Sequence, residues 1–158
     1  RDHGCDWSSD VCSSDLGPED GSGARRSMQA ALRQAGIQPS EVQHLNAHAT
    51  STPVGDKGEM AAIKSLFGDQ ASIAVTSTKS ATGHLLGAAG GIEAIFTVLA
   101  IRDQIAPATL NFENPDDAAQ GLDIVHGAAR PMEIEYALSN GFGFGGVNAS
   151  VLFKRYQE

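Results

Sequence analysis

Residues 85–101 constrain the fold most, because nearly every residue in this stretch is apolar. Its length invites a membrane-spanning interpretation, but Glu93 lies near its middle and three glycines interrupt it, Gly87, Gly90 and Gly91. A charge at the centre of a bilayer is costly, so a buried helix of a globular protein fits better. A helix that is apolar nearly all round must be covered on every side. We therefore predict that residues 85–101 form a central helix between other layers.

The first sixteen residues differ from the rest of the chain. Residues 1–16 hold both cysteines, the only tryptophan and two copies of Ser-Ser-Asp, without helical or strand periodicity. Cys5 and Cys12 lack the spacing of a metal site, and a single disulfide would be unusual in an otherwise cysteine-free chain. The stretch DWSSDVCSSDL resembles a translated sequencing-adapter oligonucleotide. We predict that residues 1–16 are non-native and poorly ordered, and that residues 17–158 are one domain whose own N-terminal portion is missing.

The remaining residues alternate helices and strands and then continue as a run of strands. We expect a loop over residues 17–23, a helix over 27–35 that ends at Gly36, and a helix that starts at a capping box, Asp56-x-x-Glu59, and ends at Gly68. Short apolar runs predict strands over residues 42–46, 72–76, 122–125, 136–140 and 149–153. This order indicates an α/β domain with a mixed sheet packed between helices.

The charge balance narrows the classes of partner. The chain carries a formal net charge of −8. An acidic chain does not favour binding to a nucleic-acid backbone, and it offers no basic patch for an anionic membrane surface. No secretory signal opens the sequence, so we expect no export.

The first candidate cluster, NAHATSTPVGD at residues 46–56, lies between a predicted strand and a predicted helix. The carboxyl ends of strands are where open α/β sheets place ligands. His48 is either a hydrogen-bonded loop histidine or a functional imidazole, and Thr50 and Thr52 are either turn-capping hydroxyls or ligand contacts. His44 lies about 13 Å from His48 along an extended strand, which is too far for both to bind one metal ion.

The second cluster is TSTKSATGH at residues 76–84. We expect His84 near a helix N-terminus, where the dipole favours a neutral imidazole that can donate to an oxygen on which charge develops. Lys79 enters an apolar neighbourhood, where an unpaired ammonium is costly. Glu93 is the only charge on the following helix, so we predict a Lys79–Glu93 ion pair. Such a pair is compatible with a purely structural role and with a catalytic one.

The third cluster is SNGFGFGGVN at residues 139–148. It contains G-x-G-x-x-G, but a strand is predicted after it and only twelve residues follow Gly146, so a dinucleotide-binding interpretation fails. A glycine-rich hairpin remains, which carries Phe142 and Phe144 and offers backbone N–H groups to an oxyanion.

Together, NAHATSTPVGD, TSTKSATGHLLGAAGG and SNGFGFGGVN resemble the C-terminal half of the β-ketoacyl-acyl-carrier-protein synthase II family in their order and separation. The resemblance runs from about Gly17 to Arg155 and implies a thiolase-like fold. In that family a cysteine takes the acyl chain as a thioester, malonyl-carrier protein loses CO2, and the resulting carbanion attacks the thioester. The resemblance therefore implies an acyltransferase of fatty-acid synthesis.

The resemblance also implies roles for individual residues. His48 and His84 would support malonyl decarboxylation and stabilise the enolate oxygen. Lys79, held by Glu93, would have a mainly electrostatic role. Phe144 matches the gatekeeper position, and its N–H would contribute to the oxyanion hole.

On the substrate side, the resemblance implies that Thr50 and Thr52 hydrogen-bond the phosphopantetheine arm and that Phe142 contacts substrate. The arm arrives on the acyl carrier protein, so no separate cofactor and no metal is expected. A homodimer in the bacterial cytoplasm is implied, with an organellar counterpart as the alternative.

The family's nucleophilic cysteine belongs to the half that precedes these motifs, and neither Cys5 nor Cys12 lies in a matching motif. We therefore expect this chain alone to be inactive and to present an apolar face that the other half covers. Three alternatives stay open: a polyketide synthase condensing domain, a non-catalytic partner resembling a chain-length factor, and a biosynthetic thiolase that uses coenzyme A.

Overall fold

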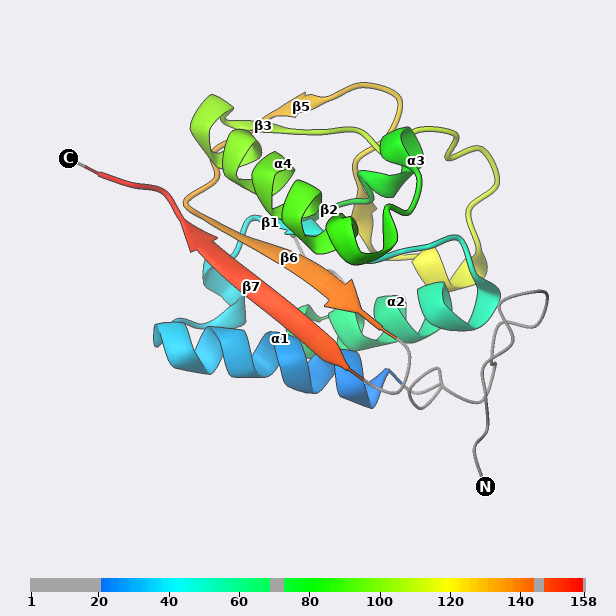
Figure 1. Cartoon of the computed structure of the whole chain (residues 1–158), viewed down its shortest axis with the longest axis horizontal. Coiled ribbons are helices and arrows are strands. Elements are labelled where there is room, and N and C mark those ends of the chain that lie inside the picture. The colour runs from blue at the N-terminus through cyan, green and yellow to red at the C-terminus, as the bar shows by residue number, and fades with distance from the viewer. Residues whose placement is uncertain (1–20, 69–72, 144–146, 158) are drawn as a thin grey trace.

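The structure is a computed structural model that describes residues 21–68, 73–143 and 147–157 (Figure 1). The predicted non-native segment, residues 1–16, lies outside the described residues, as does Phe144. Within the described parts, no helix is long and apolar enough to cross a bilayer.

A five-stranded mixed sheet forms the centre of the molecule. Its strands are β1 (His44–Asn46), β2 (Ala74–Thr76), β4 (Asp123–Ile124), β6 (Tyr136–Phe142) and β7 (Asn148–Lys154), in the spatial order β4-β2-β1-β6-β7. The first four run parallel, and β7 pairs antiparallel with β6. All three residues of β1 and of β2 are buried, as is typical of parallel strands covered on both faces. The predicted mixed sheet is confirmed.

Helices cover both faces of this sheet (Figure 1). On one face, α1 (Ser22–Ala35) and α2 (Pro53–Phe67) pack on the sheet around Met28, Ile63 and Leu138, and α4 (Ala89–Asp103) packs on the other face. The smaller elements are η1 (Pro39–Glu41), α3 (Lys79–Thr82), η2 (Leu86–Ala88), β3 (Ile105–Ala106), η3 (Asp117–Ala119) and β5 (Arg130–Pro131). The predicted sheet between helices is therefore present.

The first helix begins earlier than predicted. Residues 22 and 23, expected in a loop, already belong to α1, and Gly21 precedes it with a φ of 67°. An ideal Cβ at Gly21 would lie 2.0 Å from the carbonyl oxygen of Gly58 on α2, so only glycine permits this close approach of the two helices. Packing against α2 thus outweighs the low helix propensity of Gly23. The helix ends before Gly36, as predicted.

The second helix also begins earlier, which makes the predicted capping box wrong. Thr52 is the N-cap and Pro53 is the first helical residue, a position where proline is favoured because its missing N–H has no helical partner. Asp56 therefore lies in the first turn, and Glu59 faces the interior instead of the helix end. The predicted end at Gly68 is confirmed.

The central apolar helix is shorter than predicted and is not covered all round. Helix α4 starts at Ala89, after the short helix η2, and ends at Asp103. Glu93 is buried, but Leu86, Ile95 and Val98 are 69%, 59% and 46% exposed. The prediction that this helix is covered on every side is therefore wrong for this chain, because only one side is buried. The exposed side agrees with the expected apolar face.

His44 on β1 is a fully buried histidine. Its Nε2 lies 3.3 Å from Thr76 Oγ1, and the Thr76 hydroxyl donates to the Pro107 carbonyl, so we assign the ring proton to Nε2. Burial lowers the pKa of His44 from 6.5 to about 4. The ring is therefore uncharged at neutral pH.

This buried ring predicts a pH-dependent loss of stability. Because the unfolded chain binds the His44 proton first, the free energy of unfolding should fall as the pH drops from 6.5 towards 4, by up to about 3 kcal/mol. Urea unfolding of the chain and of His44→Leu at pH 7, 5.5 and 4.5 measures this loss. The variant should lose less stability, and an equal loss in both proteins would exclude His44 as its source.

Candidate active site

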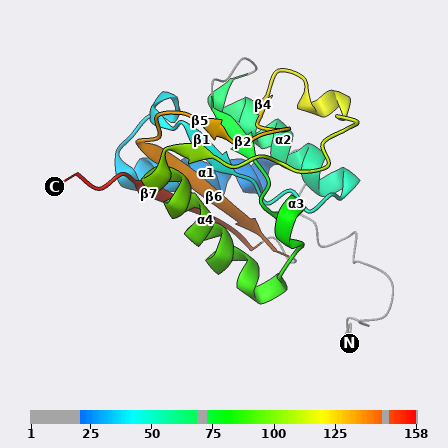
Figure 2. The same cartoon turned by 90° about the horizontal axis from the view of Figure 1, so that it is seen from above.

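The polar clusters meet at one edge of the sheet. His48 follows β1, Lys79 follows β2, and Phe142 ends β6. Because β1 pairs in parallel with both β2 and β6, their carboxyl ends lie side by side. Seen from above, α3 lies beside the N-terminal end of α4 at this same edge (Figure 2). The structure thus brings the first two clusters together at this edge.

The two candidate histidines are in contact. The ring centroids of His48 and His84 lie 5.5 Å apart with an interplanar angle of 89°, and the Phe142 ring lies 5.7 Å from that of His48. The pKa of His48 is lowered from 6.5 to about 4, chiefly because burial penalises the charged ring and further because Lys79 and His84 bring positive charge nearby. At neutral pH His48 is therefore uncharged and keeps one N–H to donate.

His84 does not lie at a helix N-terminus, which corrects the predicted dipole argument. It follows α3 and Gly83, whereas α4 begins only at Ala89. Gly83 has a φ of 73°, a left-handed conformation that glycine adopts readily, and this turn brings His84 to His48. His84 is exposed, in contrast to the half-buried His48.

Lys79 and Glu93 form the predicted ion pair. Lys79 Nζ lies 2.5 Å from Glu93 Oε1, and the two side chains are only 4% and 2% exposed. The ammonium meets the carboxylate without hydrogen-bond alignment, and within the described residues neither Lys79 Nζ nor Glu93 Oε2 has a hydrogen-bond partner. Burial keeps solvent from screening the attraction between the two charges.

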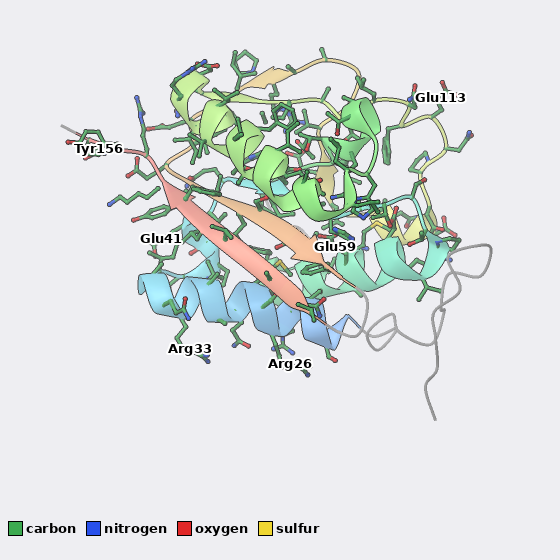
Figure 3. The ribbon with its side chains drawn as sticks, in the orientation of Figure 1. Arg26, Arg33, Glu41, Glu59, Glu113 and Tyr156 are labelled. Atoms are coloured by element: carbon green, nitrogen blue, oxygen red, sulfur yellow. The ribbon has the colours of Figure 1, made fainter. Side chains whose placement is uncertain are left out.

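Glu59 shapes the loop that carries His48, and the sequence interpretation missed this role. Its carboxylate accepts the N–H of His48 at 3.0 Å, the N–H of Ala49 at 2.8 Å and the side-chain amide of Asn140 at 2.9 Å. Figure 3 shows Glu59 directed into the interior, whereas Arg26 and Arg33 on α1 point outwards. Burial raises the pKa of Glu59, and the three donors oppose this shift. The available signal was its i, i+4 spacing to core residue Ile63.

Thr50 and Thr52 lie at the start of α2, with their hydroxyl oxygens 3.3 Å apart. Thr52 occupies the N-cap position, but its side chain makes no capping hydrogen bond. Instead its N–H donates to Asp56 Oδ1 at 3.3 Å. The two hydroxyls are thus paired with each other and do not cap the helix, so their alternative role as ligand contacts stays a prediction.

A cavity of about 590 Å³ opens beside these residues, a volume typical of small-molecule sites. Thr50, Thr52, Lys79 and His84 line it, whereas His48 and Phe142 do not appear in its wall. Its apolar floor comes from α2 and the sheet, with Met60, Ile63, Val75 and Ile124. Within the described ranges, no three His, Cys, Asp or Glu side chains gather as metal ligands would.

The third cluster includes the end of β6 and the start of β7. Gly143 N–H donates to the Val147 carbonyl at 2.8 Å, and strand β7 follows, which confirms the predicted hairpin. Phe142 faces the His48 ring. Phe144 lies outside the described residues, so its gatekeeper role stays a prediction.

Comparisons with known proteins identify the family of the chain. The model of the beta-ketoacyl synthase C-terminal domain matches residues 3–113. The 3-oxoacyl-[acyl-carrier-protein] synthase 2 of Rhizobium meliloti is 55% identical over 139 residues, which are 87% of this chain and 32% of that protein. The Staphylococcus aureus enzyme of the same name is 53% identical over 87% of this chain and 33% of its own length.

Solved structures show the same fold. A beta-ketoacyl synthase from Burkholderia phymatum superposes with a TM-score of 0.85 at 36% identity, over 94% of this chain and 36% of that one. The AntDE:AntF complex, in which a type II polyketide acyl-carrier protein is bound to its ketosynthase, gives 0.84 at 35% identity, over 90% of this chain and 35% of that one. The expected thiolase-like condensing-enzyme fold is confirmed.

The chain spans about a third of the length of the curated relatives that it matches. The family match begins at residue 3, inside the predicted non-native segment, so the nature of residues 1–16 stays a prediction. The matched residues include the two loops that bring His48, Lys79 and His84 together. The chain belongs to the beta-ketoacyl synthase family and contains its C-terminal domain.

Proposed function

We propose that this chain is the C-terminal part of a 3-oxoacyl-acyl-carrier-protein synthase 2, which condenses malonyl-carrier protein with an acyl thioester and releases CO2. The observation that carries the proposal is the contact between the uncharged His48 ring and His84 beside the buried Lys79–Glu93 pair. The names of relatives that are 53–55% identical support the same reaction.

Decarboxylation leaves negative charge on the thioester oxygen of the resulting enolate. A neutral imidazole that faces this oxygen can donate its one N–H to it, and a preorganised donor stabilises charge better in the transition state than in the ground state. His48 has this uncharged state because burial and Lys79 both disfavour its protonation. In the proposed mechanism His48 and His84 hold the enolate oxygen, and Lys79 supplies a fixed positive charge.

The substrate side of the proposal rests on the cavity. Thr50 and Thr52 line it with hydroxyls that do not cap α2, and they would hydrogen-bond a phosphopantetheine arm. Phe142, which contacts the His48 ring, would contact the acyl group, and Phe144 would be the gatekeeper. The arm would arrive on an acyl carrier protein, so the proposal needs no separate cofactor.

The exposed face of α4 supports the need for a second half. Ile95 and Val98 on α4, with Leu86 on the preceding η2, present apolar surface that the relatives' additional length has room to cover. The nucleophilic cysteine would come from that half, which is why we propose that this chain alone is inactive. Homodimerisation and a cytoplasmic location remain predictions.

The three alternative functions are less well supported. The AntDE:AntF ketosynthase and the ishigamide ketosynthase/chain length factor have the same fold, but at 35% and 33% identity. The contact between His48 and His84, with Lys79 behind it, argues against a non-catalytic chain-length-factor role. Nothing in the site favours a coenzyme A-dependent thiolase.

A chimera tests the proposed function. Residues 17–158 replace the matching segment of the Rhizobium meliloti relative, and the product is assayed with malonyl-carrier protein and acyl-carrier protein. We expect CO2 and 3-oxoacyl-carrier protein from the chimera and from the intact relative, and neither from the present chain alone. A folded chimera that accepts the acyl group but releases no CO2 would overturn the proposal.

A further inference from the structure

Lys79 belongs to a helix that is too short to be stable on its own. Helix α3 has only four residues, and a single helical turn has no independent stability in water. Its position must therefore come from tertiary contacts. On the sheet side, the Thr78 hydroxyl lies 3.1 Å from both the amide nitrogen and the amide oxygen of the buried Asn46 side chain.

The other side of this turn is tied to residues 107–110, which we call the strap. The Thr76 hydroxyl donates to the Pro107 carbonyl at 2.8 Å, and the Ser77 N–H donates to Thr109 Oγ1 at 3.0 Å. One residue further, the Leu110 N–H donates to Ser80 Oγ at 2.8 Å. Three hydrogen bonds thus run along the strap to residues on both sides of Lys79.

Thr109 is the central and best-anchored residue of the strap. Its own N–H donates to the Val125 carbonyl at 2.7 Å, beside strand β4, so the hydroxyl is held by the backbone of the sheet edge. Its partner Ser77 also donates its hydroxyl to the Ala49 carbonyl at 3.2 Å, next to His48. A shift of Ser77 would therefore disturb both the lysine turn and the histidine loop.

We propose that Thr109 is a positioning residue for Lys79: its hydroxyl oxygen, by accepting the Ser77 N–H, keeps the one-turn helix in place and the ammonium on Glu93. That the position of Lys79 matters for catalysis rests on the proposed function. That Thr109 holds Lys79 in this position does not. Without the acceptor, the Ser77 N–H is left unsatisfied in a half-buried place, and the turn should open more often.

Selective labelling of lysines tests this inference on the chain as it stands. Acetylation by acetic anhydride is followed by peptide mass spectrometry for Lys79, with Lys57, Lys64 and Lys154 as internal references. Thr109→Val keeps the shape and removes the hydroxyl. We expect Lys79 to be acetylated about fivefold faster, the factor that corresponds to the loss of one hydrogen bond, while the reference lysines keep their rates. Thr109→Ser should restore the slow rate.

The control must lower stability without touching the lysine turn. Gln43→Leu serves, because the Gln43 side-chain oxygen accepts the N–H groups of Glu135 and Tyr136 at the opposite end of the sheet. A rise in Lys79 labelling that equals the rise in Gln43→Leu would show a merely structural role and overturn the inference. The inference would also be overturned if Lys79 were labelled as fast in Thr109→Ser as in Thr109→Val.

A second variant covers the case in which Thr109→Val fails to fold. Ser80→Ala leaves Thr109 intact but removes the acceptor of the Leu110 N–H, and with it the hydrogen bond from the Ser80 hydroxyl to the Ser77 carbonyl. Lys79 should also be acetylated faster in this variant. An unchanged rate would contradict the inference that the strap supports the turn. Because labelling does not depend on turnover, its failure is distinguishable from an inactive chimera.

Discussion

Replacing His48 or His84 by alanine in the chimera is expected to slow malonyl decarboxylation about 100- to 1000-fold, the usual effect of removing one donor to a developing oxyanion. Transfer of the acyl group to the cysteine should stay largely intact, because the two rings are proposed to act on the enolate that forms later. Release of labelled CO2 from malonyl-carrier protein and formation of the acyl-enzyme measure the two steps separately.

His126→Ala is the matched control for these variants. His126 is exposed, and its nearest aromatic partner is Phe112 and not one of the site histidines. It should decarboxylate at the parent rate. Decarboxylation at that same rate in both His48→Ala and His84→Ala would remove the pair from the mechanism.

Truncating either member of the Lys79–Glu93 pair should destabilise the chain by about 3–5 kcal/mol, because it leaves an uncompensated buried charge. Replacing both, as in Lys79→Met with Glu93→Leu, should cost less than the sum of the single changes. Urea unfolding of the parent, the two single variants and the double variant measures this coupling.

The exposed pair Lys57–Asp116 provides the comparison. Its atoms lie 3.4 Å apart, but the side chains are 57% and 48% exposed, so solvent screens the attraction and the same cycle should show little coupling. Strictly additive effects at Lys79 and Glu93 would mean that the buried contact contributes nothing specific. The lysine would then be held by the strap and Asn46 alone.

Local patterns in the sequence predicted much of the architecture. Helical spacing located α1, α2 and α4, and the ends at Gly36 and Gly68 follow from residues next to the helices themselves. The Lys79–Glu93 contact was also predictable, because each charge stands alone in an apolar or small-residue setting and a buried charge needs a partner. The helix ends depend only on residues adjacent in sequence. The ion pair could be predicted because Glu93 was the only charge on the helix that follows Lys79.

The exposed side of α4 shows where such patterns mislead. An apolar circumference indicates that the helix is covered, but it does not say by which chain. Ile95 and Val98 are exposed, and none of the described residues covers them. The sequence showed that this helix is apolar enough to be buried, and only the tertiary structure showed that part of its apolar surface is exposed.

The site divides in the same way. The sequence by itself determined the residue types at the sheet edge, because His48, Lys79 and His84 all lie between a predicted strand and the long helix that follows it. Only the tertiary structure decided which residues surround them. Glu59, which holds the His48 loop, accepts a hydrogen bond from Asn140, 81 residues away. Ser77, beside Lys79, donates to Thr109, 32 residues away. The physical reason is that a hydrogen bond between distant segments depends on strand register and helix packing, which no spacing within one segment encodes.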